Sequence, residues 1–96
     1  MSHYLAIVED AGAETAVGVW FPDLPGCFSA GDDVEAALAN ARTALALYAE
    51  ELAASGRAMP PPRSVAQLRA DPVVAADLAS NLMALVSFEP TGVAAE

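Results

Sequence analysis

The sequence contains no lysine, one cysteine and one histidine among its 96 residues. A single cysteine excludes an internal disulfide, and nothing in the cysteine content indicates an oxidising compartment. Cys27 lies in FPDLPGCFSA with no histidine or basic residue beside it, so a packed thiol is favoured over a nucleophile. His3 has no ligand at zinc-binding spacing and is the only base available to a serine. We therefore expect no metal, no cofactor and no catalytic residue.

Positive charge is scarce. Four arginines face thirteen aspartates and glutamates, which gives a formal net charge of −9. Such a surface repels phosphate backbones, so we expect no direct nucleic-acid binding by this chain. It attracts basic proteins and speeds their encounter at low salt. Acidity that serves only solubility is the alternative explanation.

Long hydrophobic runs are also missing, although 55% of the residues are hydrophobic. Polar residues such as Asn40, Arg42 and Asp77 interrupt every apolar stretch, so no membrane span is expected. The opening MSHYLAIVED lacks the basic start of a signal peptide, which favours a cytoplasmic protein. The apolar content suits one small folded domain, with some apolar surface left for another copy or a partner.

The first third of the chain predicts three strands, which are rich in β-branched and aromatic residues. We place them at His3–Glu9, Thr15–Phe21 and Cys27–Ala30. A glycine-containing turn over residues 10–14 joins the first two strands. Residues 22–26, PDLPG, form the second connection, because proline has no amide donor and fixes φ.

A long helix follows, and we expect Asp32 to begin it in a capping box with Glu35. Gly56 ends the helix. Apolar residues recur at steps of three and four and form one stripe, which consists of Val34, Leu38, Ala41, Leu45, Tyr48 and Leu52.

The last third predicts an extended Met59–Pro62, a short helix over residues 65–69 capped by Ser64, and another helix that starts at Pro72. A fourth strand spans Met83–Phe88. The resulting β-β-β-α-(short α)-β order predicts an α+β fold. An antiparallel sheet of three to four strands carries the long helix on one face, and the last strand returns to a sheet edge.

Bulky apolar residues gather around the proline-containing turn, namely Trp20, Phe21, Leu24 and Phe28. They cannot all point to one face, and aromatic side chains left outside a small core are typical of interface centres. Packing under the helix is the alternative for each of them. Leu24, between two prolines, fits either a contact surface or a lid on the core.

Acidic residues offer a second, weaker hypothesis, because paired metal ions require several carboxylates at one point. A residual nuclease would use Glu9, Asp23 and Asp32. Helix capping and turn formation explain the same residues without a metal, so we favour the structural interpretation.

Residues 19–52, VWFPDLPGCFSAGDDVEAALANARTALALYAEEL, closely resemble the central motif of HicB antitoxins. The shared pattern is FPDLPGC-x-S-x-GD followed by a helix with Glu35-Ala36 and Asn40-Ala41 pairs. YLAIVED and MPPPRS also resemble the family, which extends the similarity over roughly residues 3–65.

This resemblance implies a partial RNase H-like fold without a nuclease centre. It also implies that the chain binds a HicA-type toxin, a small protein that cleaves messenger RNA, and masks the toxin's active site and RNA surface. With the charge pattern, it makes the proline-containing turn and its neighbouring acids the expected contact surface. The expected contact residues are Trp20, Phe21, Asp23, Leu24, Phe28 and Asp32.

Many HicB proteins carry a C-terminal DNA-binding module, and no basic segment of that kind follows the fourth strand here. We therefore expect a toxin-binding domain over residues 1–90, a flexible tail over 91–96 and no DNA-binding domain in this chain. The chain is either a standalone HicB-like domain or part of a longer protein. A dimer or larger homo-oligomer is also expected, because so short a sheet leaves edge strands unpaired. A domain that pairs only with itself, without a toxin, is the alternative function.

Overall fold

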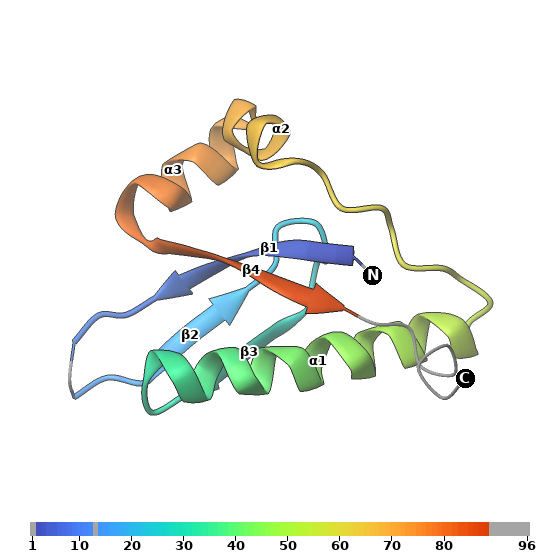
Figure 1. Cartoon of the computed structure of the whole chain (residues 1–96), viewed down its shortest axis with the longest axis horizontal. Helices are drawn as coiled ribbons and strands as arrows, with labels where there is room; N and C mark the ends of the chain where they lie inside the picture. The colour runs from blue at the N-terminus through green and yellow to red at the C-terminus, as the bar shows by residue number, and fades with distance from the viewer. Residues whose placement is uncertain (1, 13, 89–96) are drawn as a thin grey trace.

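The computed structural model describes residues 2–12 and 14–88, so the expected tail lies outside the described residues. One antiparallel sheet with strand order β3-β2-β1-β4 forms the centre of the molecule (Figure 1). The strands are β1 (Ser2–Glu9), β2 (Val17–Trp20), β3 (Phe28–Gly31) and β4 (Leu82–Phe88). The helices are α1 (Val34–Ala54), α2 (Val65–Ala70) and α3 (Pro72–Ser80). The predicted α+β fold is confirmed, and β4 occupies the expected edge.

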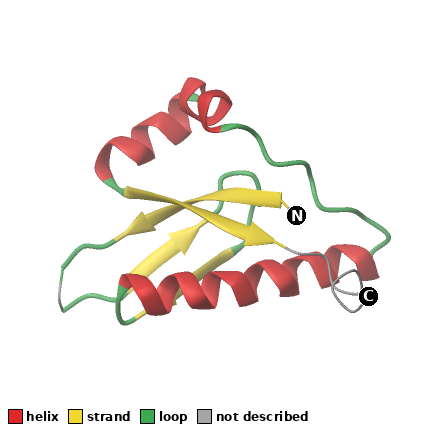
Figure 2. Cartoon of the chain, viewed as in Figure 1, coloured by secondary structure: helices red, strands yellow, loops and turns green. Residues whose placement is uncertain are grey.

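The long helix α1 covers one face of the sheet, and α2 and α3 lie on the opposite side (Figure 2). Strand β1 shows why two layers are needed. Tyr4, Ala6 and Val8 are buried in the cluster under α1, whereas Leu5 and Ile7 are buried on the other face. Successive strand residues point to opposite faces, so a strand that is apolar throughout has to be covered on both sides.

The core under α1 includes the predicted helix stripe. Ala41, Leu45 and Leu52 are buried, and Val34, Leu38 and Tyr48 are partly buried. The stripe also contains Ala37, which is fully buried where the helix passes closest to β3. The small side chain allows this close approach.

The second layer is smaller and was only partly expected. Leu68 of α2 and Val74 of α3 pack against Leu5 and Ile7, with Trp20 at the margin. The sequence predicted both helices, and Ser64 does cap α2, in a capping box with Gln67. It did not predict that they cover the sheet face opposite α1.

Two local predictions were wrong. The cap of α1 is Asp33, not Asp32: the Asp33 carboxylate accepts a hydrogen bond from the Ala36 amide at 2.7 Å, while Asp32 is exposed in the bend before it. Because β3 continues to Gly31, the helix begins one residue later than expected. The strands flanking the proline-containing turn also differ from the prediction, since Phe21 and Cys27 belong to the turn. β2 is shorter than predicted, and β3 keeps its predicted length but begins and ends one residue later.

Candidate functional site

The connection between β2 and β3, residues 21–27, is called the Pro loop below. Three backbone hydrogen bonds close it: the Phe21 amide donates to Cys27 O, Leu24 to Phe21 O, and Cys27 to Leu24 O, at 3.0–3.3 Å. Gly26 supplies the positive φ, +84°, that the turn requires. The loop folds inward and Leu24 becomes fully buried. Leu24 is therefore a lid on the core, which was one of the two alternatives.

Arg63 fixes the Pro loop to the second helical layer. Its Nε donates to Asp23 Oδ1 at 2.6 Å, and its backbone amide donates to Asp23 Oδ2 at 2.9 Å. Its Nη1 reaches Asp71 Oδ2 at 3.2 Å, and Asp71 caps α3 through the Val73 amide. The Asp23 side chain is only 7% exposed. Its carboxylate is thus occupied by Arg63 and holds the loop in place.

The hydrogen bond from Arg63 lowers the pKa of Asp71 below its ordinary value of 3.8, with the Val73 amide as the second cause. A lowered folded-state pKa stabilises the fold above the unfolded-state value and loses that effect as the pH falls through the folded-state value. We expect the domain to lose stability as the pH falls below about 4. The Arg63→Ala variant should lose less stability over the same pH range. Urea titrations at neutral and acidic pH measure this difference. Arg69→Ala, at an exposed position, is the control, and equal acid sensitivity in all three proteins would contradict the assignment.

Phe28 and Trp20 lie on the outer side of the Pro loop, next to α3. Phe28 is 71% exposed, and so is Val73 of α3, while Trp20 is half-buried between them. These three residues line an open hollow of about 370 Å³, with Asp77 on its wall. We call this the Phe28 groove. It combines exposed aromatic surface with acidic groups at its margin, as a protein interface does.

Four exposed carboxylates gather where the β1–β2 turn approaches the start of α1: Asp10, Asp32, Asp33 and Glu35. We call them the acidic pole. None of the arginines that the structure describes lines this hollow. Among the described residues, no group of histidine, cysteine, aspartate and glutamate side chains is arranged to hold a metal ion. The residues named for a nuclease are separated, because Asp23 lies in the Pro loop and Asp32 beyond the far end of β3.

Cys27 is buried, and this burial raises the pKa of its thiol to about 11. The side chain is therefore neutral near pH 7 and packs as a small apolar group. In the part of the chain that the structure describes, no helix combines the length and apolarity needed to cross a membrane.

A family model for the HicB-like antitoxin of bacterial toxin–antitoxin systems matches residues 4–96. The chain belongs to this family. No curated protein sequence matches it. The resemblance inferred from FPDLPGC-x-S-x-GD is thus confirmed for nearly the whole chain.

Solved structures of HicB antitoxins share the fold. The Burkholderia pseudomallei antitoxin HicB is similar with a TM-score of 0.76 and 29% identity, over 93% of this chain. This chain spans 64% of the length of that antitoxin. The isolated N-terminal domain of the same antitoxin gives a TM-score of 0.72 and 30% identity, over 91% of this chain and 98% of the domain. A HicA3 and HicB3 toxin–antitoxin complex contains a chain with a TM-score of 0.70 and 26% identity, over 92% of this chain and 99% of that one.

Within this HicB-like domain, the residues expected to bind a partner fall into two groups. Phe21 and Leu24 are buried in the core, 2% and 0% exposed, so neither is accessible to a second protein in this conformation, and their role in binding stays a prediction. Asp23 is nearly buried against Arg63. The remaining three, Trp20, Phe28 and Asp32, are accessible to a second protein, and their role in binding stays a prediction. Asp32 lies in the acidic pole rather than beside the groove.

Two residues of this site, Arg63 and Val73, were not predicted from the sequence. Arg63 lies 40 residues from Asp23, and no local spacing connects them. Val73 is one of two valines after a helix-starting proline, and its 71% exposure depends on how α3 packs. The preference of buried carboxylates for arginine gives a general reason to search for a partner of Asp23, but it does not identify which arginine.

Proposed function

We propose that this chain is the antitoxin of a type II toxin–antitoxin pair, and that it neutralises a HicA-type, mRNA-cleaving toxin by covering the toxin's active site and RNA surface. The main support is its similarity to a chain of the HicA3 and HicB3 complex over 92% of its length. The action is binding without catalysis, and the cytoplasm, where messenger RNA is found, is its place of action.

The charge of the chain supports this mechanism. A toxin that binds RNA requires cationic side chains for the phosphates, and a net charge of −9 competes for them. The acidic pole concentrates four of these charges at one end of the molecule. Concentrated charge accelerates the encounter with a basic protein, and it does so most at low salt.

The Phe28 groove supplies the apolar part of the proposed interface. Leaving Phe28 71% exposed in the free domain is unfavourable, and burying it against a toxin gains about 25 cal/mol for each Å² removed from water. Large aromatic groups near an interface centre carry most of the binding free energy. We therefore propose that Phe28, with Trp20 and Val73, forms the centre of the toxin contact.

Phe28→Ala is expected to weaken toxin binding by about 30-fold, the effect of losing a central aromatic contact worth about 2 kcal/mol. Its unfolding midpoint should be unchanged, because an exposed side chain contributes little to folding. The measurement is calorimetric titration with the small basic protein encoded beside the gene, together with relief of that protein's growth inhibition.

Leu85→Ala is the matched control, because Leu85 is 55% exposed at the opposite edge of the sheet. Unchanged affinity in the Phe28 variant would remove the groove from the interface. A wild-type chain that neither binds the neighbouring protein nor relieves its toxicity would contradict the antitoxin proposal. It would favour the second candidate, a domain that pairs only with itself, for which the exposed apolar residues of β4 are the supporting observation.

A further inference from the structure

The aromatic side of the Phe28 groove is formed by two neighbouring strands. Trp20 of β2 and Phe28 of β3 are directly paired, so their side chains lie next to each other on one sheet face. The second helical layer covers this face only as far as its margin at Trp20. Phe28 is left 71% exposed. The floor of the groove is therefore an open pair of aromatic side chains.

Helix α3 forms the wall of the groove. Val73 and Asp77 both line it, and they lie on the same side of the helix because they are four positions apart. Asp77 is half-buried, and in the described part of the chain it forms no salt bridge. Partial burial lowers the local dielectric constant and strengthens the attraction of this carboxylate for a positive charge.

Arg63 also lines the groove, but its charge is already neutralised. Asp23 binds its guanidinium at 2.6 Å and Asp71 binds it at 3.2 Å. No other basic residue among the described ones lines the groove. With Asp77, three carboxylates face one guanidinium. The groove thus combines exposed aromatic surface with a surplus of negative charge.

We infer that the Phe28 groove binds an arginine side chain of the toxin, packed against Trp20 and Phe28 and paired with Asp77; this inference rests on the proposed function. Aromatic rings attract a cation through the negative potential of their faces, and the carboxylate supplies the opposite charge. Arginine is favoured over lysine because its guanidinium is planar, weakly hydrated and able to form two parallel hydrogen bonds with a carboxylate.

The chemistry of this occupant links the groove to inhibition. Arginine is also the side chain best suited to bidentate binding of phosphate, which a toxin that cleaves RNA requires. A guanidinium held by Asp77 and two aromatic side chains is withdrawn from phosphate. The groove therefore takes the place of RNA at one cationic position of the toxin.

The first test is the binding of the full chain to the small basic protein encoded beside the gene, measured by surface plasmon resonance. Asp77→Asn keeps the shape of the side chain and removes its charge. It should raise the dissociation constant about 10-fold, mainly through faster dissociation, because the lost charge pair is at the interface centre.

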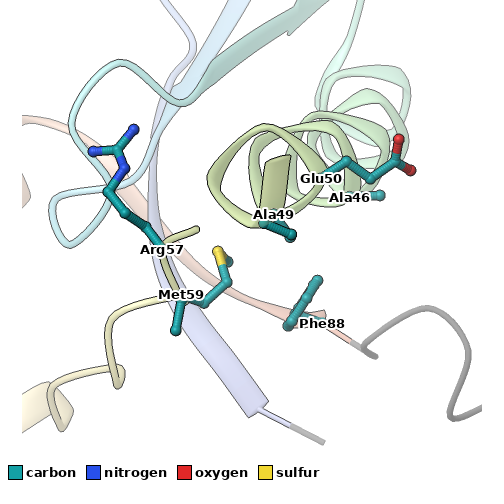
Figure 3. A pocket seen from close by; sticks show the side chains of 8 residues that line it. Ala46, Ala49, Glu50, Arg57, Met59 and Phe88 are labelled. Carbon is teal, nitrogen blue, oxygen red and sulfur yellow. The ribbon is translucent and has the colours of Figure 1, made fainter. Parts of the chain in front are cut away.

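Glu50→Gln is the matched control, because it removes one charge at an exposed position of α1, beside a separate hollow lined by Met59 and Phe88 (Figure 3). It should change the dissociation constant by less than about twofold, since salt screens a distant exposed charge. Circular dichroism verifies that both variants are folded. Equal effects of the two variants would overturn the inference, because net charge alone would then account for them.

Substitutions of Phe28 distinguish a cationic occupant from an apolar one. Phe28→Tyr keeps the ring and should bind as the wild type does. Phe28→Leu keeps apolar surface but removes the ring, so it should remain about 10-fold weaker than the wild type. If Phe28→Leu binds normally while Phe28→Ala does not, the groove holds an apolar side chain. The inference would then be overturned while the antitoxin proposal stands.

A double-mutant cycle identifies the arginine. Each arginine of the basic protein is replaced by alanine and by lysine, and each variant is titrated with the wild-type chain and with Asp77→Asn. One alanine variant should bind about 10-fold more weakly, and Asp77→Asn should weaken it no further. Additive effects for every arginine, or full affinity with lysine at that position, would overturn the inference. A basic protein that does not bind the wild-type chain at all would contradict the antitoxin proposal as well.

Discussion

Replacement of Gly31 by alanine is expected to destabilise the domain by about 3 kcal/mol, the upper part of the range for added methyl groups. A Cβ at this position would lie 2.4 Å from the Ala37 amide nitrogen and 2.8 Å from both Ala36 C and Ala37 Cα. All three are backbone atoms in the first turns of α1, so no side-chain rotation can relieve the overlap. The helix or the end of β3 has to move.

Neither element is free to move. The Ser29 hydroxyl of β3 donates to Ala37 O at 3.1 Å, and the Asn40 side-chain amide donates to Ala30 O at 2.8 Å. Displacing α1 by the distance that a methyl group needs would break both hydrogen bonds and open the cluster around Ala37 and Ala41. A domain of this size is stable by roughly 5–10 kcal/mol, so the variant would lose a large share of its stability.

Urea unfolding of Gly31→Ala beside Gly18→Ala measures the effect with a matched control. Gly18 lies in β2, and a Cβ there would meet no atom within 4 Å. We expect Gly18→Ala to be neutral or stabilising by up to about 1 kcal/mol, because alanine restricts the unfolded chain. Equal midpoints for the two variants would show that the close contact between β3 and α1 is absent in solution.

This junction also gives the family motif a physical reason. In FPDLPGC-x-S-x-GD, Ser29 donates a hydrogen bond to the helix backbone, Gly31 permits the close approach, and Gly26 supplies the turn of the Pro loop.

The strands and the long helix were predictable, because their periodicity is a local property of the sequence. The cap was misplaced by one residue because Asp32 and Asp33 are equally competent acceptors. The residue at which β3 ends, Gly31, decides between them, and no local signal encodes it.

The candidate site was less predictable because it depends on contacts between distant segments. The sequence grouped Phe21, Leu24 and Phe28, but it could not say which of them the Pro loop turns inward. That choice follows from the three hydrogen bonds within the loop and from the pairing of Asp23 with Arg63. The coverage of Leu5 by α2 and α3 is likewise a tertiary effect, since it depends on packing between residues more than 60 positions apart in the sequence.

Leu24→Ala is expected to cost about 3 kcal/mol of folding free energy, the usual effect of truncating a fully buried leucine. Phe28→Ala, four residues away, should change it by less than about 0.5 kcal/mol, because the ring is 71% exposed. The two variants remove side chains of similar apolarity from one short segment. Urea midpoints therefore report directly which of the two belongs to the core.

The effects of the two variants on toxin affinity should be the reverse of their effects on stability. Affinities are compared without urea, at a temperature where both variants are folded. Leu24→Ala should then keep the wild-type affinity, since the Leu24 side chain is buried and has no access to a second protein. Phe28→Ala should lose affinity while remaining stable. A Leu24 variant that folds normally but no longer binds would mean that the Pro loop opens on the toxin and exposes Leu24. The loop would then have to separate Asp23 from Arg63, and Arg63→Ala should strengthen binding by favouring the open form. Unchanged affinity in Leu24→Ala would instead show that the loop stays closed and that the toxin contacts only its outer side.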